Sequence, residues 1–331
     1  MNFSIDFLIG NFAPKYTMTP TLIYVHIGSE LPDHLVTSLV QARMFSPEIP
    51  VFVAANHQAI RNRKPVYLRN SVNVQWIALE SIPKSNEHVA WLAAMGEIRK
   101  EEMYWYFTRQ RFLFLNDLIE FLAVKNVWHL ECDNLIFSSL TSLTAKVKAS
   151  YSGIAATFNN DFRCIPGCIF FPDLASIRTL SSTFIDLAGK RMSDMKIIAQ
   201  CALKHGPKAI GYLPIMFEPY LSDYPLTKEM RDLVDDVHAY TQSIDEEGSI
   251  FDASAHGQFL DGTNWGKEPG YITAECIFDP SNFGYEWQRD HKQRLVPYVH
   301  YRRKSYRLNN LHIQSKRLER FASSRLELEY S

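Results

Sequence analysis

Residues 21–137 alternate between short apolar runs and stretches in which apolar side chains recur every three or four positions. The apolar runs are rich in β-branched and aromatic residues, as in buried strands. In the stretches between the runs, apolar side chains recur at the spacing of helices packed on a sheet. This alternation predicts an α/β fold with a mostly parallel sheet covered by helices on both faces. The expected strands are 21–28, 51–56, 72–78 and 127–130, and the expected helices start near Pro32 and cover 86–95 and 109–125.

The chain of 331 residues could form two domains or one large α/β domain. It contains no clean linker, internal repeat or low-complexity tract, so we expect a single domain over 1–331. Beyond residue 150 the pattern becomes mixed: 153–158 and 168–171 have strand character and a helix is expected over about 173–190. The segment 217–270 shows little periodicity.

Composition excludes several classes of protein. A net charge of -1 gives no general reason to expect nucleic acid as a partner. The five cysteines have no framework spacing, which favours reduced thiols and a cytoplasmic protein; Cys164 and Cys168 are expected to be core thiols. The stretch 1–15 has no basic region and Asp6 interrupts its apolar residues, so it is a poor signal peptide. No run approaches the roughly 18 apolar residues of a spanning helix, which leaves at most peripheral contact with a membrane.

The stretch "HLECDNLIF" (129–137) places Glu131, Asp133 and Asn134 between two apolar runs, at the expected end of a strand. Ligands of open parallel sheets bind outside the carboxyl ends of the strands. There, a divalent cation can sit on Asp133 while bridging phosphate oxygens of a nucleotide, with Glu131 accepting from a sugar hydroxyl or a water. Because two acids at this spacing are common, the strand context carries the prediction.

Residues 291–320 hold nine Lys or Arg against one Glu, in contrast to the rest of the chain. They could form a solvated helix or a surface that meets phosphate. Within them, His312 is suited to complete the coordination of a metal already held by a carboxylate, and Lys316 to neutralise diphosphate oxygens. The alternative for His312 is an ordinary surface or core histidine.

Three motifs in order resemble GT-A glycosyltransferases: the "ExDN" step after an apolar strand, "IFDASAHGQFLDG" (250–262), and "LHIQSK" (311–316). More narrowly, they resemble bacterial and large-virus sugar transferases that build polysaccharides or surface glycans, over roughly residues 20–320. Asp261 stands where that family usually has Gly, and "TNWGKEPG" after it departs from the common pattern. Glu131 replaces the usual first Asp.

The resemblance implies a GT-A (Rossmann-like) fold, a nucleotide-sugar donor, Mn²⁺ or Mg²⁺, and transfer to the hydroxyl of a glycan, lipid-linked or protein acceptor. It further implies a nucleotide-sugar-binding half over about 20–150, an acceptor half over 151–290, and a basic tail, 291–320, that closes over the diphosphate. The implied roles are metal binding by Asp133, His312 and Glu131, diphosphate binding by Lys316, nucleobase contacts at His26 and Gly28, and phosphate or ribose contacts by Arg109 or Arg111.

Two further carboxylates compete for the acceptor side. Asp252 lies in the irregular segment beside "GQ" and has no evident capping role, so it is expected to be the catalytic base. Asp194 stands where several GT-A enzymes carry an Asp facing the reacting sugar, but Ser193 and Asp194 are both good helix N-caps, which explains an acid there without catalysis. The aromatic run 104–107 could stack on a sugar, although core packing is the expectation.

Two other functions remain open at this point. A sugar nucleotidyltransferase would also need strand-end acids, but its Gly-rich basic phosphate loop is replaced here by the acidic "GSELPDH" (28–34). A non-catalytic carbohydrate- or nucleotide-binding protein of the same fold is the other alternative.

Overall fold

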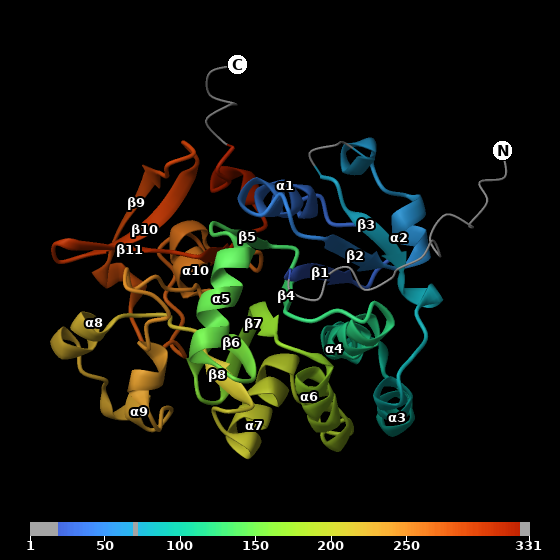
Figure 1. The fold of residues 1–331 in the computed structure, drawn as a ribbon. Helices are drawn as coiled ribbons and strands as arrows, with labels where there is room; N and C mark the ends of the chain where they lie inside the picture. Colours follow the sequence, from blue (N-terminus) through green and yellow to red (C-terminus); the bar gives the residue numbers. More distant parts are fainter. Residues whose placement is uncertain (1–18, 69–71, 325–331) are drawn as a thin grey trace.

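The computed structural model of the protein describes residues 19–68 and 72–324, and Figure 1 shows its fold. At its centre is a seven-stranded sheet in the order β3-β2-β1-β4-β7-β6-β8. Within this sheet β7 runs antiparallel to β4 and β6, whereas the other pairs are parallel. The α/β class and the mostly parallel sheet are therefore confirmed. The strands are β1 (Thr21–His26), β2 (Val51–Ala55), β3 (Gln75–Ala78), β4 (Val127–Leu130), β6 (Ile154–Asn160), β7 (Arg163–Phe171) and β8 (Ile210–Tyr212).

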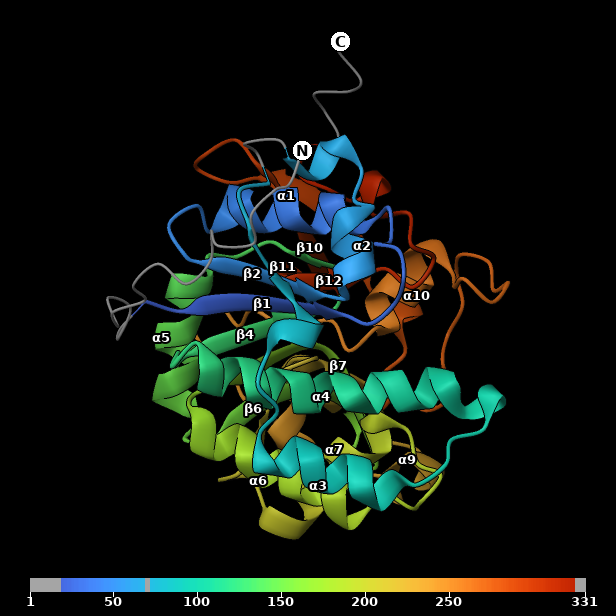
Figure 2. The same cartoon turned by 90° about the vertical axis from the view of Figure 1, so that its right-hand side faces the viewer.

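Helices cover both faces of the sheet (Figures 1 and 2). Because side chains alternate along a strand, Leu22 and Tyr24 of β1 join one buried cluster and Ile23 and Val25 join the other. The first cluster packs under α1 (Leu35–Phe45) and α5 (Leu140–Ser150). The second packs against α3 (Asn86–Met95), α4 (Met103–Phe121), α6 (Leu174–Asp186) and α7 (Asp194–His205).

The part of the chain after residue 150 is mixed, as expected, and its strands also form two further small sheets, one of which includes a strand from before residue 150. One is antiparallel, with β9 (Gly284–Arg289), β10 (Leu295–Tyr301) and β11 (Lys304–Arg307); the other pairs β5 (Asn134–Ile136) with β12 (Asn310–His312). The basic segment 291–320 thus contains the three strands β10, β11 and β12 and, as its helical part, the 3₁₀ turn Leu318–Arg320, so its interpretation as a solvated helix is wrong. The shorter helices are α2 (His57–Arg61), α8 (Glu218–Asp223), α9 (Lys228–Arg231), α10 (Ala255–Asp261) and the 3₁₀ turns Pro65–Leu68, Leu79–Ser81, Lys100–Glu102, Val237–Tyr240, Pro280–Asn282 and Leu318–Arg320.

Two sequence expectations concern membrane spans and the state of the cysteines. Across residues 19–68 and 72–324, no helix has both the length and the apolar character that crossing a membrane requires. The five cysteines are free thiols, and Cys164 and Cys168 are buried in the core. The poor signal peptide inferred for 1–15 lies outside the described residues.

Candidate active site

A short turn at the end of β4 brings the strand-end acids next to the C-terminal part of the chain. Glu131 and Asp133 stand between β4 and β5, and the backbone N–H of Asn134 donates to the carbonyl of Glu131 at 3.1 Å. The antiparallel β5–β12 pair then sets His312 opposite Asn134, and Ile313 N–H donates to the carbonyl of Asp133 at 2.9 Å. Backbone pairing therefore places His312 beside two acids that are remote in sequence.

Glu131, Asp133 and His312 form a compact group of potential metal ligands. His312 Nε2 lies 3.2 Å from Asp133 Oδ2 and 3.3 Å from Glu131 Oε2, and the ligand atoms of all three residues lie within 4.8 Å of one another. Asp133 and His312 are 5% and 4% exposed, so water screens them little. Two carboxylates and an imidazole suit a divalent cation such as Mn²⁺, which fits the metal implied by the family resemblance.

Two cations flank this group. Lys316 Nζ pairs with Asp133, and Arg111 of α4, whose side chain is 12% exposed, pairs with Glu131 on one side and with Asp194 Oδ2, at 3.0 Å, on the other. Burial raises the pKa of Asp133, but His312 and Lys316 outweigh it and hold this pKa well below its usual range. For His312, burial lowers the pKa, yet Asp133 and Glu131 raise it above the ordinary value. Asp133 is therefore negatively charged, and the positive charges of His312 and Lys316 balance that charge.

Asp261, which stands where the family that the sequence motifs resemble usually has Gly, anchors the segment that carries Lys316. Its carboxylate is 0% exposed and pairs with Arg317 at 2.9 Å and with Arg320; Ser315 Oγ also donates to it. Lys316 has a φ of 69°, in the left-handed region that side-chain-bearing residues rarely adopt. The Asp261 contacts thus hold a strained backbone that directs the ammonium to Asp133.

The expectation that Asp252 has no capping role is wrong. Its Oδ1 accepts from His256 N–H at 3.0 Å, and its Oδ2 accepts from Gly257 N–H at 3.0 Å and His312 N–H at 2.9 Å. Asp252 is 1% exposed, and burial raises its pKa to about 6 although these three donors favour the charged form. Because both oxygens are bound to backbone, Asp252 positions α10 and His312 and is poorly placed to act as a base.

For Asp194 the expected capping role is the one that the structure does not show. Ser193 caps α7 by accepting from Lys196 N–H, so the cap explanation does not apply to Asp194, the first residue of the helix. Asp194 pairs instead with Arg111 and lines the same cavity as Glu131 and Asp133. Burial raises the pKa of Asp194 in spite of Arg111. The structure therefore places Asp194, and not Asp252, among the residues that line this cavity.

The cavity over the metal-ligand group has a volume of about 260 Å³. Several of its lining residues were not identified from the sequence. Ser254 and Gln258 lie within the "FDASAHGQ" motif and Gln314 within "LHIQSK", which could have indicated them. The newly identified lining residues include Thr108, Asn159, Arg163, Ser254, Gln258, Trp265 and Gln314, and Tyr104 and Trp105 of the aromatic run 104–107 line the cavity as well.

Three of the expected donor-binding residues lie apart from this cavity. Arg109 donates to the carbonyls of Trp105, Ala188 and Lys190 and lines a different hollow, so it ties α4 to the 188–190 loop. His26 Nε2 lies 2.6 Å from the carbonyl of Glu30, and Gly28 N–H donates to Asn56 Oδ1. The nucleobase role of His26 and Gly28 stays a prediction.

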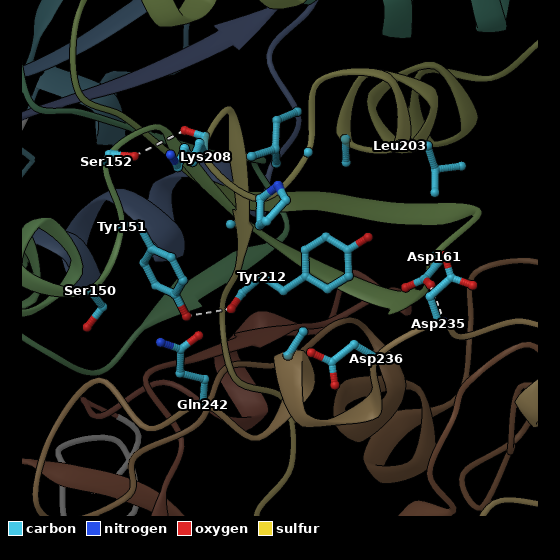
Figure 3. Close-up of a pocket in the computed structure, with 16 residues that line it drawn as sticks. Ser150, Tyr151, Ser152, Asp161, Leu203, Lys208, Tyr212, Asp235, Asp236 and Gln242 are labelled. Carbon is cyan, nitrogen blue, oxygen red and sulfur yellow. Dashed lines mark hydrogen bonds between the residues drawn. The ribbon is translucent and has the colours of Figure 1, made fainter.

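A second hollow, of about 430 Å³, lies beside the edge strand β8 (Figure 3). Tyr151 Oη donates to the carbonyl of Tyr212 at 2.5 Å, and the ring of Tyr212 lines the hollow. The buried Asp161 accepts from Tyr240 Oη and from Asp235 N–H, so both of its oxygens are used within the fold. This hollow is the weaker candidate for an active site, because the Glu131–Asp133–His312 group lines the 260 Å³ cavity instead.

Comparison with known proteins gives remote likenesses in structure. No family model and no curated protein matches the sequence. Among solved structures, mouse xyloside xylosyltransferase 1 aligns with a TM-score of 0.44 and 8% identity over 66% of this chain and 94% of its own. The galactosyltransferase LgtC aligns at 0.39 and 15% over 64% and 82%, and the glycosyltransferase GlyE of Streptococcus pneumoniae at 0.35 and 12% over 56% and 43%. All three TM-scores lie below 0.5, so these likenesses carry no argument about this protein.

Proposed function

We propose that the protein is a divalent-metal-dependent glycosyltransferase that moves a sugar from a nucleotide-sugar donor to an acceptor hydroxyl, in the synthesis of a polysaccharide or surface glycan. The observation that carries the proposal is the convergence of Glu131, Asp133 and His312 within 4.8 Å at the end of a parallel strand, with Lys316 beside them. A metal and an ammonium at a strand end suit a nucleotide diphosphate, whose negative charge grows as it leaves.

Each charged residue has a part in this proposal. Asp133, Glu131 and His312 would hold Mn²⁺ or Mg²⁺, which when bound offsets charge on the leaving diphosphate. Lys316 contacts the same diphosphate. Arg111 fixes the positions of Glu131 and Asp194 through its two ion pairs. Asp194 faces the reacting sugar or the acceptor hydroxyl.

We also propose which part of the chain binds the donor, the acceptor and the diphosphate. The donor nucleotide binds to the half formed by about 20–150, with His26 and Gly28 near the base. The half formed by 151–290 takes the acceptor, and the basic segment 291–320 closes over the diphosphate. Its last part supports this role, because it supplies both His312 and Lys316 to the site. We place the protein in the cytoplasm, at most peripheral to a membrane.

Thermal shift with UDP-, GDP- and dTDP-sugars, each with and without Mn²⁺, tests the proposal. A ligand that binds only the native state raises the melting temperature, so a rise that needs both sugar nucleotide and Mn²⁺ supports it. Hydrolysis of the stabilising donor then distinguishes a transferase from a non-catalytic binding protein. Formation of a nucleotide sugar from nucleoside triphosphate and sugar phosphate would instead identify a nucleotidyltransferase. Loss of the donor effect in Asp133→Asn, with Asp186→Asn as the surface-carboxylate control, ties binding to the site.

A further inference from the structure

Three large aromatic side chains stand exposed around the same cavity. Tyr104 is 69% exposed, Trp105 42% and Trp265 56%, and all three line the cavity. The expectation that the run 104–107 packs in the core is therefore wrong for its first two residues, whereas Tyr106 lies 5.0 Å from the ring of the buried Trp91. Exposed aromatic surface gathered at one site indicates a surface that binds something.

Trp265 is presented by a well-anchored turn. Thr263 N–H donates to the carbonyl of Lys267 at 2.9 Å, and Lys267 N–H donates to Thr263 Oγ1. Gly262 has a φ of 69° and its backbone approaches the Lys267 carbonyl so closely that a Cβ would lie 2.0 Å from that oxygen. Asp261, just before the turn, is fixed by its arginines. The indole therefore projects from a turn whose backbone is held by hydrogen bonds.

The same cavity offers buried hydrogen-bond acceptors. Asn159 Oδ1 and Gln258 Oε1 are buried and have no hydrogen-bond partner among the described residues, and both residues line the cavity. Gln258 Nε2 donates to Ser254 Oγ at 3.2 Å, which leaves Oε1 available to a ligand. Buried amide oxygens normally accept a hydrogen bond, and hydroxyl groups are suitable donors to them.

Aromatic faces combined with hydroxyl acceptors match a sugar ring, which has an apolar C–H face and a rim of hydroxyls. An acyl chain would leave Asn159 and Gln258 without donors, and the charged residues Asp194 and Arg163 around them disfavour it. We propose that the acceptor in the transfer is itself a carbohydrate, whose terminal ring lies between Trp265 and the Tyr104–Trp105 pair. This inference rests on the proposed function and names its acceptor class.

The transfer forms one bond and breaks one bond at the anomeric carbon of the donor sugar. An oxygen of the acceptor sugar forms a bond to the anomeric carbon of the donor sugar. The bond from that carbon to the diphosphate oxygen breaks, and its electron pair leaves with the nucleoside diphosphate. The proton of the acceptor hydroxyl passes to a basic oxygen in the cavity. The nucleotide-sugar donor is the only co-reactant.

Kinetics of Trp265→Ala and Trp105→Ala test the inference, with Phe121→Ala as the control. Phe121 is an aromatic residue at the far end of α4, 53% exposed and not among the residues that line the cavity. The acceptor panel consists of methyl glycosides of glucose, galactose, mannose and xylose together with maltose, cellobiose and lactose. With the donor found by thermal shift, we expect each tryptophan variant to raise acceptor KM by about tenfold while donor hydrolysis stays within about twofold. The Phe121 variant should behave as wild type.

A binding measurement without donor keeps this inference separable from the proposed function. Saturable quenching of tryptophan fluorescence by a panel saccharide, lost in Trp265→Ala but kept in Phe121→Ala, supports the carbohydrate site even if no nucleotide sugar binds. Donor binding with Mn²⁺ but no saccharide quenching, and no transfer to any saccharide, overturns the inference and leaves the proposed function standing. Unchanged acceptor KM in both tryptophan variants also overturns it.

Discussion

The carboxylate of Asp252 accepts a hydrogen bond from the backbone N–H of His312 at 2.9 Å. The same carboxylate accepts from His256 and Gly257 at the start of α10, so one side chain joins the "FDASAHGQ" motif to the "LHIQSK" motif. Two of the three motifs that resemble sugar transferases thus meet at Asp252. This link helps to fix His312, which the β5–β12 pairing places beside Asp133.

Asp252→Asn should lower the melting temperature and weaken Mn²⁺ binding. An amide cannot accept from all three backbone donors, and a buried donor left unsatisfied costs about 1–3 kcal/mol. Thermal denaturation and Mn²⁺ titration check this. A variant with wild-type stability and metal affinity but no turnover would instead return Asp252 to the role of a base.

Asp194→Asn should keep the fold and the metal affinity but lose most turnover. Because burial raises the pKa of Asp194 above its ordinary value of 3.8, the folded protein holds the proton over a wider pH range than the unfolded chain. A base must be deprotonated, so kcat/KM should rise with pH through a midpoint above 3.8, and stability contributed by the protonated form is lost in the same direction. The pH profile of kcat/KM is the measurement. An unchanged acid limb in Asp194→Asn would exclude Asp194.

Gly167→Ala should damage the site without a change in charge. A Cβ at Gly167 in β7 would lie 2.6 Å from both His312 Nδ1 and Asn134 Nδ2, and such overpacking costs about 1–3 kcal/mol. We expect a lower melting temperature and weaker Mn²⁺ binding. Gly189→Ala is the matched control, because a Cβ there meets nothing within 4 Å. Equal effects of the two substitutions would contradict the close packing of His312 on β7.

Lys316→Gly should separate metal binding from diphosphate binding. Glycine adopts the φ of 69° without strain, and its substitution removes the ammonium that pairs with Asp133. We expect Mn²⁺ affinity to be kept or improved, whereas nucleotide-sugar affinity in saturating Mn²⁺ falls about tenfold. Gln293→Gly, at another left-handed position (φ 62°), controls for the backbone change. Calorimetry measures both affinities; unchanged donor affinity would remove Lys316 from the diphosphate site.

Local sequence pattern predicted the strand-end acids but not which residues lie next to them in the folded chain. Glu131 and Asp133 follow an apolar run, which is a local signal. His312 joins them through the β5–β12 pairing, and no local periodicity specifies a register between segments so far apart. The family resemblance supplied that link. It also showed that Asp261 stands where the family usually has Gly, but not that this acid has two arginine partners.

The errors have physical causes of the same kind. Arg109 and Arg111 are two residues apart, roughly 200° around a helix, so one reaches the site and the other the 188–190 loop; periodicity alone does not say which. Whether Asp252 or Asp194 faces the cavity depends on which backbone N–H groups lie nearby in the folded chain. The exposure of Tyr104 and Trp105 likewise depends on what packs beside the first turn of α4.

Titration of the protein with Mn²⁺, with and without a saturating nucleotide sugar, tests the central claim most directly. Isothermal calorimetry on wild type, Asp133→Asn and the control Asp186→Asn gives the metal affinity of each. The account predicts one Mn²⁺ site whose affinity increases when donor is present, unchanged in Asp186→Asn and weakened by at least about tenfold in Asp133→Asn. Equal Mn²⁺ affinity in wild type and Asp133→Asn, or donor binding that is indifferent to Mn²⁺ in both, would contradict it.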